Sequence, residues 1–129
     1  MFDLEKAKSI AINALEDIKA KDITVLDTRQ LTSLFECMIV ATGDSNRQVR
    51  ALANNVREEL KTNHIDIIGT EGEASGEWVL VDAGPIVIHV MQAAVRDYYN
   101  LEELWGGQKP SNLTGHGRPW DPASQRETA

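Results

Sequence analysis

The amino-acid sequence predicts an α/β (α+β) domain, in which a mixed β-sheet of about five strands is packed by helices. Segments with helical periodicity alternate along the chain with segments of strand periodicity. The nearly unbroken apolar run at 35–42 is typical of a central strand that is covered on both faces. Two β-branched runs flank the turn residues Ala83, Gly84 and Pro85, and this is the clearest hairpin signal in the chain.

The first half of the chain predicts two helices and two strands. Apolar residues recur at helical spacing over 3–20, and a short β-branched run at 23–27 predicts a strand. After the apolar central strand, Ser45 and Gln48 fit a capping box that begins the next helix. In this box the Ser45 hydroxyl accepts from the Gln48 amide, and the Gln48 side chain reaches back. The helix carries one apolar stripe and ends near Asn63.

The second half predicts three strands and one helix. A short strand is expected at 65–68, followed by an exposed loop at 69–76 that contains three glycines. The hairpin strands are expected at 77–82 and 86–91, and a helix extends from there to about Trp105. The helix between the second and third strands favours a parallel crossover at that point.

The composition indicates one folded domain followed by a tail. Four of the nine glycines and three of the four prolines lie at 106–129. We therefore expect a folded domain at 1–105 and a flexible C-terminal tail at 106–129. The apolar runs are shorter than the roughly 20 residues that cross a bilayer, so no membrane segment is expected. The acidic N-terminus is unlike a targeting peptide, and the single cysteine favours a cytoplasmic protein.

Acidic residues are concentrated in one stretch of the chain. The net charge is −7, and residues 62–105 hold eight acidic residues against one basic residue, Arg96. Sequence-independent binding of nucleic acid requires a basic face, so we expect no direct DNA binding. Two interpretations of the acidic stretch are open: a solvated surface that maintains solubility, or a surface matched to a basic partner.

Few residues form patterns that are typical of catalytic or cofactor sites. The common glycine-rich motifs that bind mononucleotides and dinucleotides do not occur, and the three histidines lie far apart, so no zinc site is expected. Cys37 is interpreted as a buried small hydrophobic residue. His89 is either a general base oriented by Asp82 or a structural histidine on a half-exposed face, bonded to the backbone or to an acidic group. No nucleophile accompanies it, which favours the structural role.

The Gly43–Ser45 turn is the best candidate for a catalytic feature. Free amides at a helix N-terminus can hold an anion, and the order strand, glycine, serine, helix is similar to that of nucleotidyltransferases. Those enzymes also need two or three carboxylates around Mg²⁺. Asp66 is available, but Ile68 stands where the second acid is expected. We therefore favour a helix cap, and a nucleotide-binding or nucleotidyl-transferring enzyme is the alternative.

Four of the seven aromatic residues lie in the acid-rich stretch: Trp78, Tyr98, Tyr99 and Trp105. The simplest interpretation is that each of them packs in the core. Aromatic residues with apolar neighbours and charges at the rim are also typical of interface hot spots.

Three ordered blocks of sequence carry a resemblance to a known family. They are MIVATGDSNRQV at 38–49; the group EG, WVLVDAG and VIHVM within 71–91; and RDYYNLEELW at 96–105. A chain with these blocks at this spacing resembles the bacterial ribosomal silencing factors, the Iojap-like family. The resemblance covers about residues 4–105. The chain departs from the family at Glu36, where aspartate is common, and at Pro85, where an acidic residue commonly follows the turn glycine.

The resemblance implies a fold similar to that of nucleotidyltransferases but without a catalytic metal site, and a protein that is not an enzyme. Such a factor binds a ribosomal protein on the intersubunit face of the large subunit, blocks joining of the small subunit and represses translation when nutrients are short. Organelle relatives act in large-subunit assembly. No cofactor is implied, and the free protein is a candidate homodimer. Carried over residue by residue, the partner surface includes Trp78, His89, Met91, Arg96, Tyr99, Leu101 and Glu102.

Overall fold

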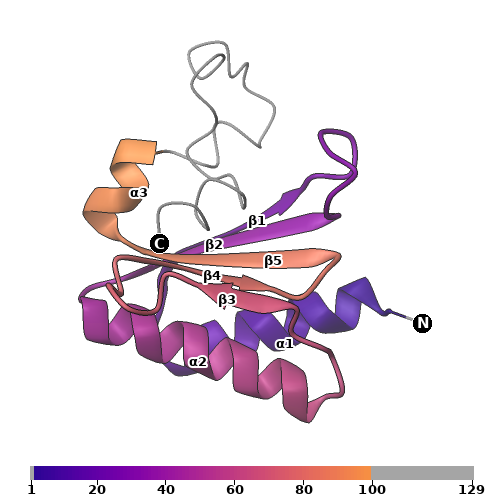
Figure 1. The fold of residues 1–129 in the computed structure, drawn as a ribbon, viewed down its shortest axis with the longest axis horizontal. Coiled ribbons are helices and arrows are strands. Elements are labelled where there is room, and N and C mark those ends of the chain that lie inside the picture. Colours follow the sequence, from indigo (N-terminus) through magenta and orange to yellow (C-terminus); the bar gives the residue numbers. More distant parts are fainter. Residues whose placement is uncertain (1, 100–129) are drawn as a thin grey trace.

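The computed structural model describes residues 2–99, with side chains up to Arg96. Its elements are α1 (Leu4–Asp17), β1 (Lys21–Asp27), β2 (Cys37–Gly43), α2 (Asn46–Thr62), β3 (Gly69–Glu71), β4 (Trp78–Asp82), β5 (Ile86–Gln92) and α3 (Ala93–Tyr99). The five strands form one sheet in the order β1-β2-β5-β4-β3. Helices α1 and α2 cover one face, and α3 lies on the other side (Figure 1). The predicted fold class is confirmed.

The sheet is mixed, with the parallel pair β2 and β5 at its centre. The other neighbouring pairs are antiparallel. The parallel crossover therefore runs from β2 through α2, β3 and β4 to β5, and our prediction that it joins the second strand to the third is wrong. The reason is burial, because β2 and β5 are each seven residues long and apolar, whereas β3 has three residues and lies at an edge.

Our prediction of a strand at 65–68 is also wrong. The structure places β3 just after this segment, in residues that we expected to form a loop. Ile65 and Ile67 pack against the core, while Ile68 donates its amide to the Asp82 carbonyl at 2.7 Å. Ile65 and Ile67 are thus used for packing against the core. β-Branched residues favour strands and also favour apolar packing, so their presence alone does not predict strand pairing.

The first two predicted helices are confirmed: α1 is shorter than the predicted 3–20, and α2 has the predicted cap at Ser45 and ends before Asn63, as expected. Helix α1 begins after Asp3, whose carboxylate accepts from the Lys6 amide at 3.1 Å. Lys19 adopts a φ of 64°, a left-handed conformation that ends the helical path. The predicted third helix is confirmed as far as Tyr99; its remainder and the expected tail at 106–129 lie outside the described residues. No helix in the described part is long and apolar enough to cross a membrane.

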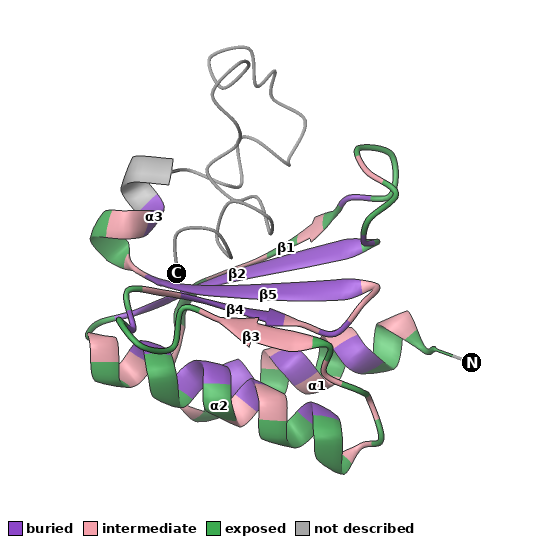
Figure 2. Ribbon diagram, in the orientation of Figure 1, coloured by how far each residue is buried: buried purple, intermediate pink, exposed green. Residues whose placement is uncertain are grey.

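Two apolar clusters lie on opposite faces of the sheet. The first joins α1 and α2 to one face, with Ile39, Ile88 and Val90 among its fully buried residues. The second lies on the face that α3 contacts, and it consists of Phe35, Met38, Val40, Leu80, Val87 and Met91, with Leu26, Trp78 and Val95 packed against it. Strands β2 and β5 are consequently buried along nearly their whole length (Figure 2). We call the side of the sheet that carries the second cluster the α3 face.

Candidate partner-binding site

Four residues of the predicted partner surface lie together on the α3 face. Trp78 of β4 pairs with Met91 of β5, and Leu80 pairs with His89. Side chains alternate along a strand, so Trp78, His89 and Met91 share the face that is opposite α1 and α2. Helix α3 follows β5 directly and lies on the same side of the sheet (Figure 1). Its Arg96 contacts this side through a hydrogen bond to Thr42 of β2. The structure thus brings together residues that are up to 18 positions apart in the sequence.

The four described residues differ in exposure. His89 and Met91 are fully buried and Arg96 is 8% exposed, whereas Trp78 is partly exposed. Tyr99 is the last residue of α3, and only its backbone is described. Leu101 and Glu102 lie outside the described residues. Trp78 is therefore the residue of this group whose side chain the structure presents to the surroundings.

Trp78 and His89 are joined by a hydrogen bond. The Trp78 Nε1–H donates to His89 Nδ1 at 2.8 Å, with the ring centroids 5.7 Å apart and the rings tilted by 49°. Our expectation of a half-exposed histidine with a backbone or acidic partner is wrong, because β5 is a central strand with both faces covered. Asp82, the proposed orienting acid, instead accepts from the Gly84 amide at 2.9 Å in the hairpin turn.

Burial determines the protonation state of His89. Transfer of the imidazole out of water lowers its pKa to about 3, so the ring is neutral at physiological pH. Because Nδ1 accepts from the indole, the ring proton is assigned to Nε2. His89 is therefore a fixed acceptor for Trp78.

Acidification should destabilise the domain through His89. The folded pKa lies below the unfolded value of 6.5, so the unfolded state binds more protons between these two values. The stabilisation is complete above pH 6.5 and is lost as the pH falls toward 3. We expect a loss of about 1–2 kcal/mol in unfolding free energy between pH 7 and pH 5. Urea titrations of the wild type and of His89→Leu measure it, and an equal loss in both proteins would contradict this assignment.

Arg96 ties α3 to the edge of the sheet. Its Nη1 donates to Thr42 Oγ1 and its Nη2 to Thr24 Oγ1, both at 2.8 Å, and Nη1 also donates to the Asp22 carbonyl. This carbonyl lies at an irregularity in the β1–β2 pairing, where Asp22 adopts a φ of 49°. The planar guanidinium can bridge three acceptors on two strands at once. The structure thus places this guanidinium inside the domain, between α3 and the sheet.

Replacing Arg96 by lysine should loosen α3 although the charge is retained. A lysine ammonium cannot reproduce the fork, so we expect a loss of about 1–2 kcal/mol in unfolding free energy. On this substitution, amide hydrogen exchange should accelerate more in α3 than in α2. The matched control is Arg47→Lys on the exposed side of α2, for which we expect no measurable change. Equal behaviour of the two variants would remove the role given to Arg96.

The Gly43–Ser45 turn is occupied by helix capping. The Ser45 Oγ accepts from the Gln48 amide at 3.1 Å, which confirms the predicted cap of α2. The Gln48 side chain accepts from the Asp44 amide, one residue earlier than expected, and donates to the Ile18 carbonyl at 3.0 Å. The turn therefore also joins the end of α1 to the start of α2.

Asp66 lies far from this turn. The 17 residues of α2 separate the two, and a helix of that length spans about 25 Å. Within the described residues, no group of three or more His, Cys, Asp or Glu side chains could hold a metal ion. The predicted enzyme alternative would need Asp66 beside the turn, and the fold holds them apart.

Loss of the cap should destabilise α2. Ser45→Ala removes the acceptor for the Gln48 amide, and such changes cost about 1 kcal/mol. Thermal unfolding should show this loss, and Ser45→Asp, which restores an acceptor at the same position, should recover it. Equal midpoints for the alanine variant and the wild type would show that the cap contributes nothing.

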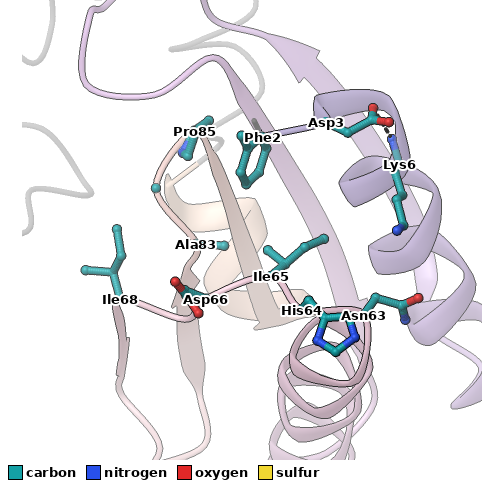
Figure 3. Close-up of a pocket in the computed structure, with 11 residues that line it drawn as sticks. Phe2, Asp3, Lys6, Asn63, His64, Ile65, Asp66, Ile68, Ala83 and Pro85 are labelled. Atoms are coloured by element: carbon teal, nitrogen blue, oxygen red, sulfur yellow. Dashed lines mark hydrogen bonds between the residues drawn. The ribbon is translucent and has the colours of Figure 1, made fainter.

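A cavity of about 590 Å³ lies at the opposite end of the hairpin from Trp78. Figure 3 shows its lining side chains at the start of α1, in the segment after α2 and at the β4–β5 turn. Phe2, Ile65 and Pro85 provide apolar surface, and His64 and Asp66 provide polar groups. Asp66 is thus a wall residue of this cavity.

Other residues of the α3 face were missing from the predicted site. Met38, Leu80 and Val87 share this face with Trp78 and Met91. Period-two alternation along the strands would have found them, because it places every second residue on one face. Phe35 precedes β2, so no such pattern indicates its position.

Comparisons with known proteins identify the family. A family model described as "Ribosomal silencing factor during starvation" matches residues 2–129. A ribosomal silencing factor from Chromobacterium violaceum is 64% identical over 119 residues, which is 92% of this chain and 98% of the relative. A crystal structure of a protein from that species is 62% identical, with a TM-score of 0.80, and covers 93% of this chain and 100% of its own. A mouse protein named "Mitochondrial assembly of ribosomal large subunit protein 1" is 27% identical over 107 residues, 81% of this chain and 45% of that protein. The chain belongs to the ribosomal silencing factor family.

Proposed function

We propose that this chain binds a ribosomal protein on the intersubunit face of the large ribosomal subunit. By occupying that face it blocks joining of the small subunit and slows translation under nutrient limitation. The observation that supports this most is the partly exposed Trp78 indole, which a buried residue holds at the border of an apolar sheet face. Tryptophan in such a setting is the residue most enriched in binding hot spots.

The charge around Trp78 favours a basic partner. The segment just before it carries Glu71 and Glu77, and Glu77 is exposed next to the indole in sequence. A ribosomal protein is typically basic, so complementary charge would speed encounter and align the two surfaces. The aromatic residue would supply affinity, and the acidic rim would supply orientation.

Repression in this proposal requires no chemistry. The domain acts by covering a surface that the small subunit must contact, so we propose a protein without enzymatic activity, metal or cofactor. The capping bonds at the Gly43–Ser45 turn and the distance to Asp66 count against a nucleotidyltransferase. We further propose a cytoplasmic protein, for which a homodimer is a candidate state when it is free.

A role in large-subunit maturation belongs to the same proposal. The mouse relative carries large-subunit assembly in its name. A factor that binds the intersubunit face can act on a maturing subunit as well as on a finished one, because the same surface is recognised. We assign the partner-binding residues to Trp78 and Tyr99, together with Leu101 and Glu102. Met91, which is fully buried, belongs to the apolar cluster against which Trp78 packs.

Co-sedimentation with purified ribosomal subunits tests the proposal. We expect the protein to pellet with large subunits and not with small subunits, and to reduce the yield of joined particles when added first. A parallel thermal-shift series with Mg²⁺ and nucleoside triphosphates should give no stabilisation. Folded protein that stays in the supernatant with large subunits would overturn the proposal. A nucleotide-dependent shift that is lost in Asp66→Ala would favour the enzyme instead.

A further inference from the structure

We infer that His89 is a positioning residue, which holds the Trp78 indole in the orientation that the ribosomal partner binds, without touching the partner. This inference rests on the proposed function and changes the role of His89 within it. Family resemblance had placed His89 on the partner surface itself.

The geometry gives His89 one clear task on the α3 face. Its side chain comes from the central strand β5, while Trp78 lies at the start of β4, diagonally across the pair. The indole N–H points at Nδ1 over 2.8 Å, and the two rings are within contact distance. A tryptophan on a β-strand has several side-chain rotamers available. A hydrogen bond from its indole N–H, the only donor of the side chain, favours the rotamer that directs this group at His89.

Burial separates the two roles. His89 is 0% exposed, so a partner that docks on the surface of the domain meets the indole and not the imidazole. The face around them is apolar, with Leu80 and Met91 beside the pair. In such surroundings the hydrogen bond is not replaced by water at low cost, so the indole orientation is held before binding. A preorganised anchor loses less conformational entropy when the partner binds.

A double-mutant cycle on large-subunit binding separates positioning from contact. His89→Leu removes the acceptor and should weaken binding about tenfold, the equivalent of one hydrogen bond. Trp78→Phe removes the donor. In that background His89→Leu should change the affinity less than about twofold, because no bond remains to be lost. His89→Asn, whose Oδ1 takes the place of Nδ1, should recover most of the affinity.

A second readout does not involve the ribosome. The indole N–H of Trp78 should give one NMR signal, which the spectrum of Trp78→Phe identifies by its loss. Its hydrogen exchange should be slow in the wild type and in His89→Asn, and at least about tenfold faster in His89→Leu. A purely structural histidine would alter the thermal midpoint without this selective change at the indole.

The outcomes are distinguishable. If wild-type protein binds large subunits and His89→Leu weakens binding equally in both backgrounds, the positioning role is overturned and His89 is a direct contact. If indole exchange is unchanged in His89→Leu, the role is overturned as well. If the wild type does not bind large subunits, the proposed function fails, and the inference fails with it.

Discussion

Replacing Gly72 by alanine is expected to lower the free energy of unfolding by about 3 kcal/mol. Gly72 adopts a φ of 87°, in the left-handed region that side chains disfavour. A Cβ built at this position would lie 2.1 Å from the carbonyl oxygen of Trp78, which is part of the backbone. The clash cannot be relieved by a rotamer change, so the loop must move away from β4.

Chemical denaturation measures the loss, and Gly69→Ala is the matched control. Gly69 lies at the start of β3, three residues earlier, and a Cβ there meets no atom within 4 Å. We expect Gly69→Ala to be neutral or slightly stabilising, since alanine reduces the freedom of the unfolded chain. Similar stabilities for the two variants would show that the loop accommodates the methyl group. Because the clash is with the backbone of Trp78, the Gly72→Ala substitution should also disturb the candidate partner-binding site.

The loop after Gly72 shows a kind of contact that the sequence did not reveal. Arg50 of α2 donates to the carbonyl oxygens of Glu73, Ala74 and Ser75, and Arg57 forms an ion pair with Glu73 at 2.7 Å. The acidic stretch was interpreted as solvated or partner-facing, yet part of it is bound to the domain's own helix. Such long-range contacts depend on how α2 lies against the sheet, which local patterns do not specify.

The fold itself was largely predictable because its signals are local. Apolar periodicity identified the three helices of the described residues, and the two β-branched runs around the turn identified β4 and β5. The central position of β2 followed from its unbroken apolar run. The strand partners were not predictable in the same way, since pairing β2 with β5 depends on which long apolar strands can share the centre.

The candidate site was predictable in part. The family resemblance indicated Trp78, His89 and Met91, and strand alternation places the three on one face. Their different roles required the structure. The sequence does not distinguish a buried imidazole that accepts from an indole, or an arginine that bridges two strands, from a polar residue exposed on the surface. Burial, which separates support from contact, is a property of the assembled sheet.

Replacing Trp78 by alanine is expected to weaken binding to the large subunit by about 2–4 kcal/mol, roughly 30- to 1,000-fold. The indole is the large, partly exposed side chain of the α3 face, and its orientation is held by His89. Truncation removes the apolar contact area that the indole would supply to the interface. Tyr99→Ala is expected to act in the same direction, because α3 lies on the same side of the sheet (Figure 1).

Quantitative binding to purified large subunits measures this loss, with unfolding followed in parallel. Ile68→Ala is the control, because Ile68 is a 67% exposed apolar residue at the opposite end of the hairpin and should bind as the wild type does. If Trp78→Ala is folded and binds normally, the partner meets another surface of the domain. If Ile68→Ala binds weakly instead, that surface is the end of the domain that carries the cavity. The pair of variants therefore decides which end of the sheet faces the ribosome.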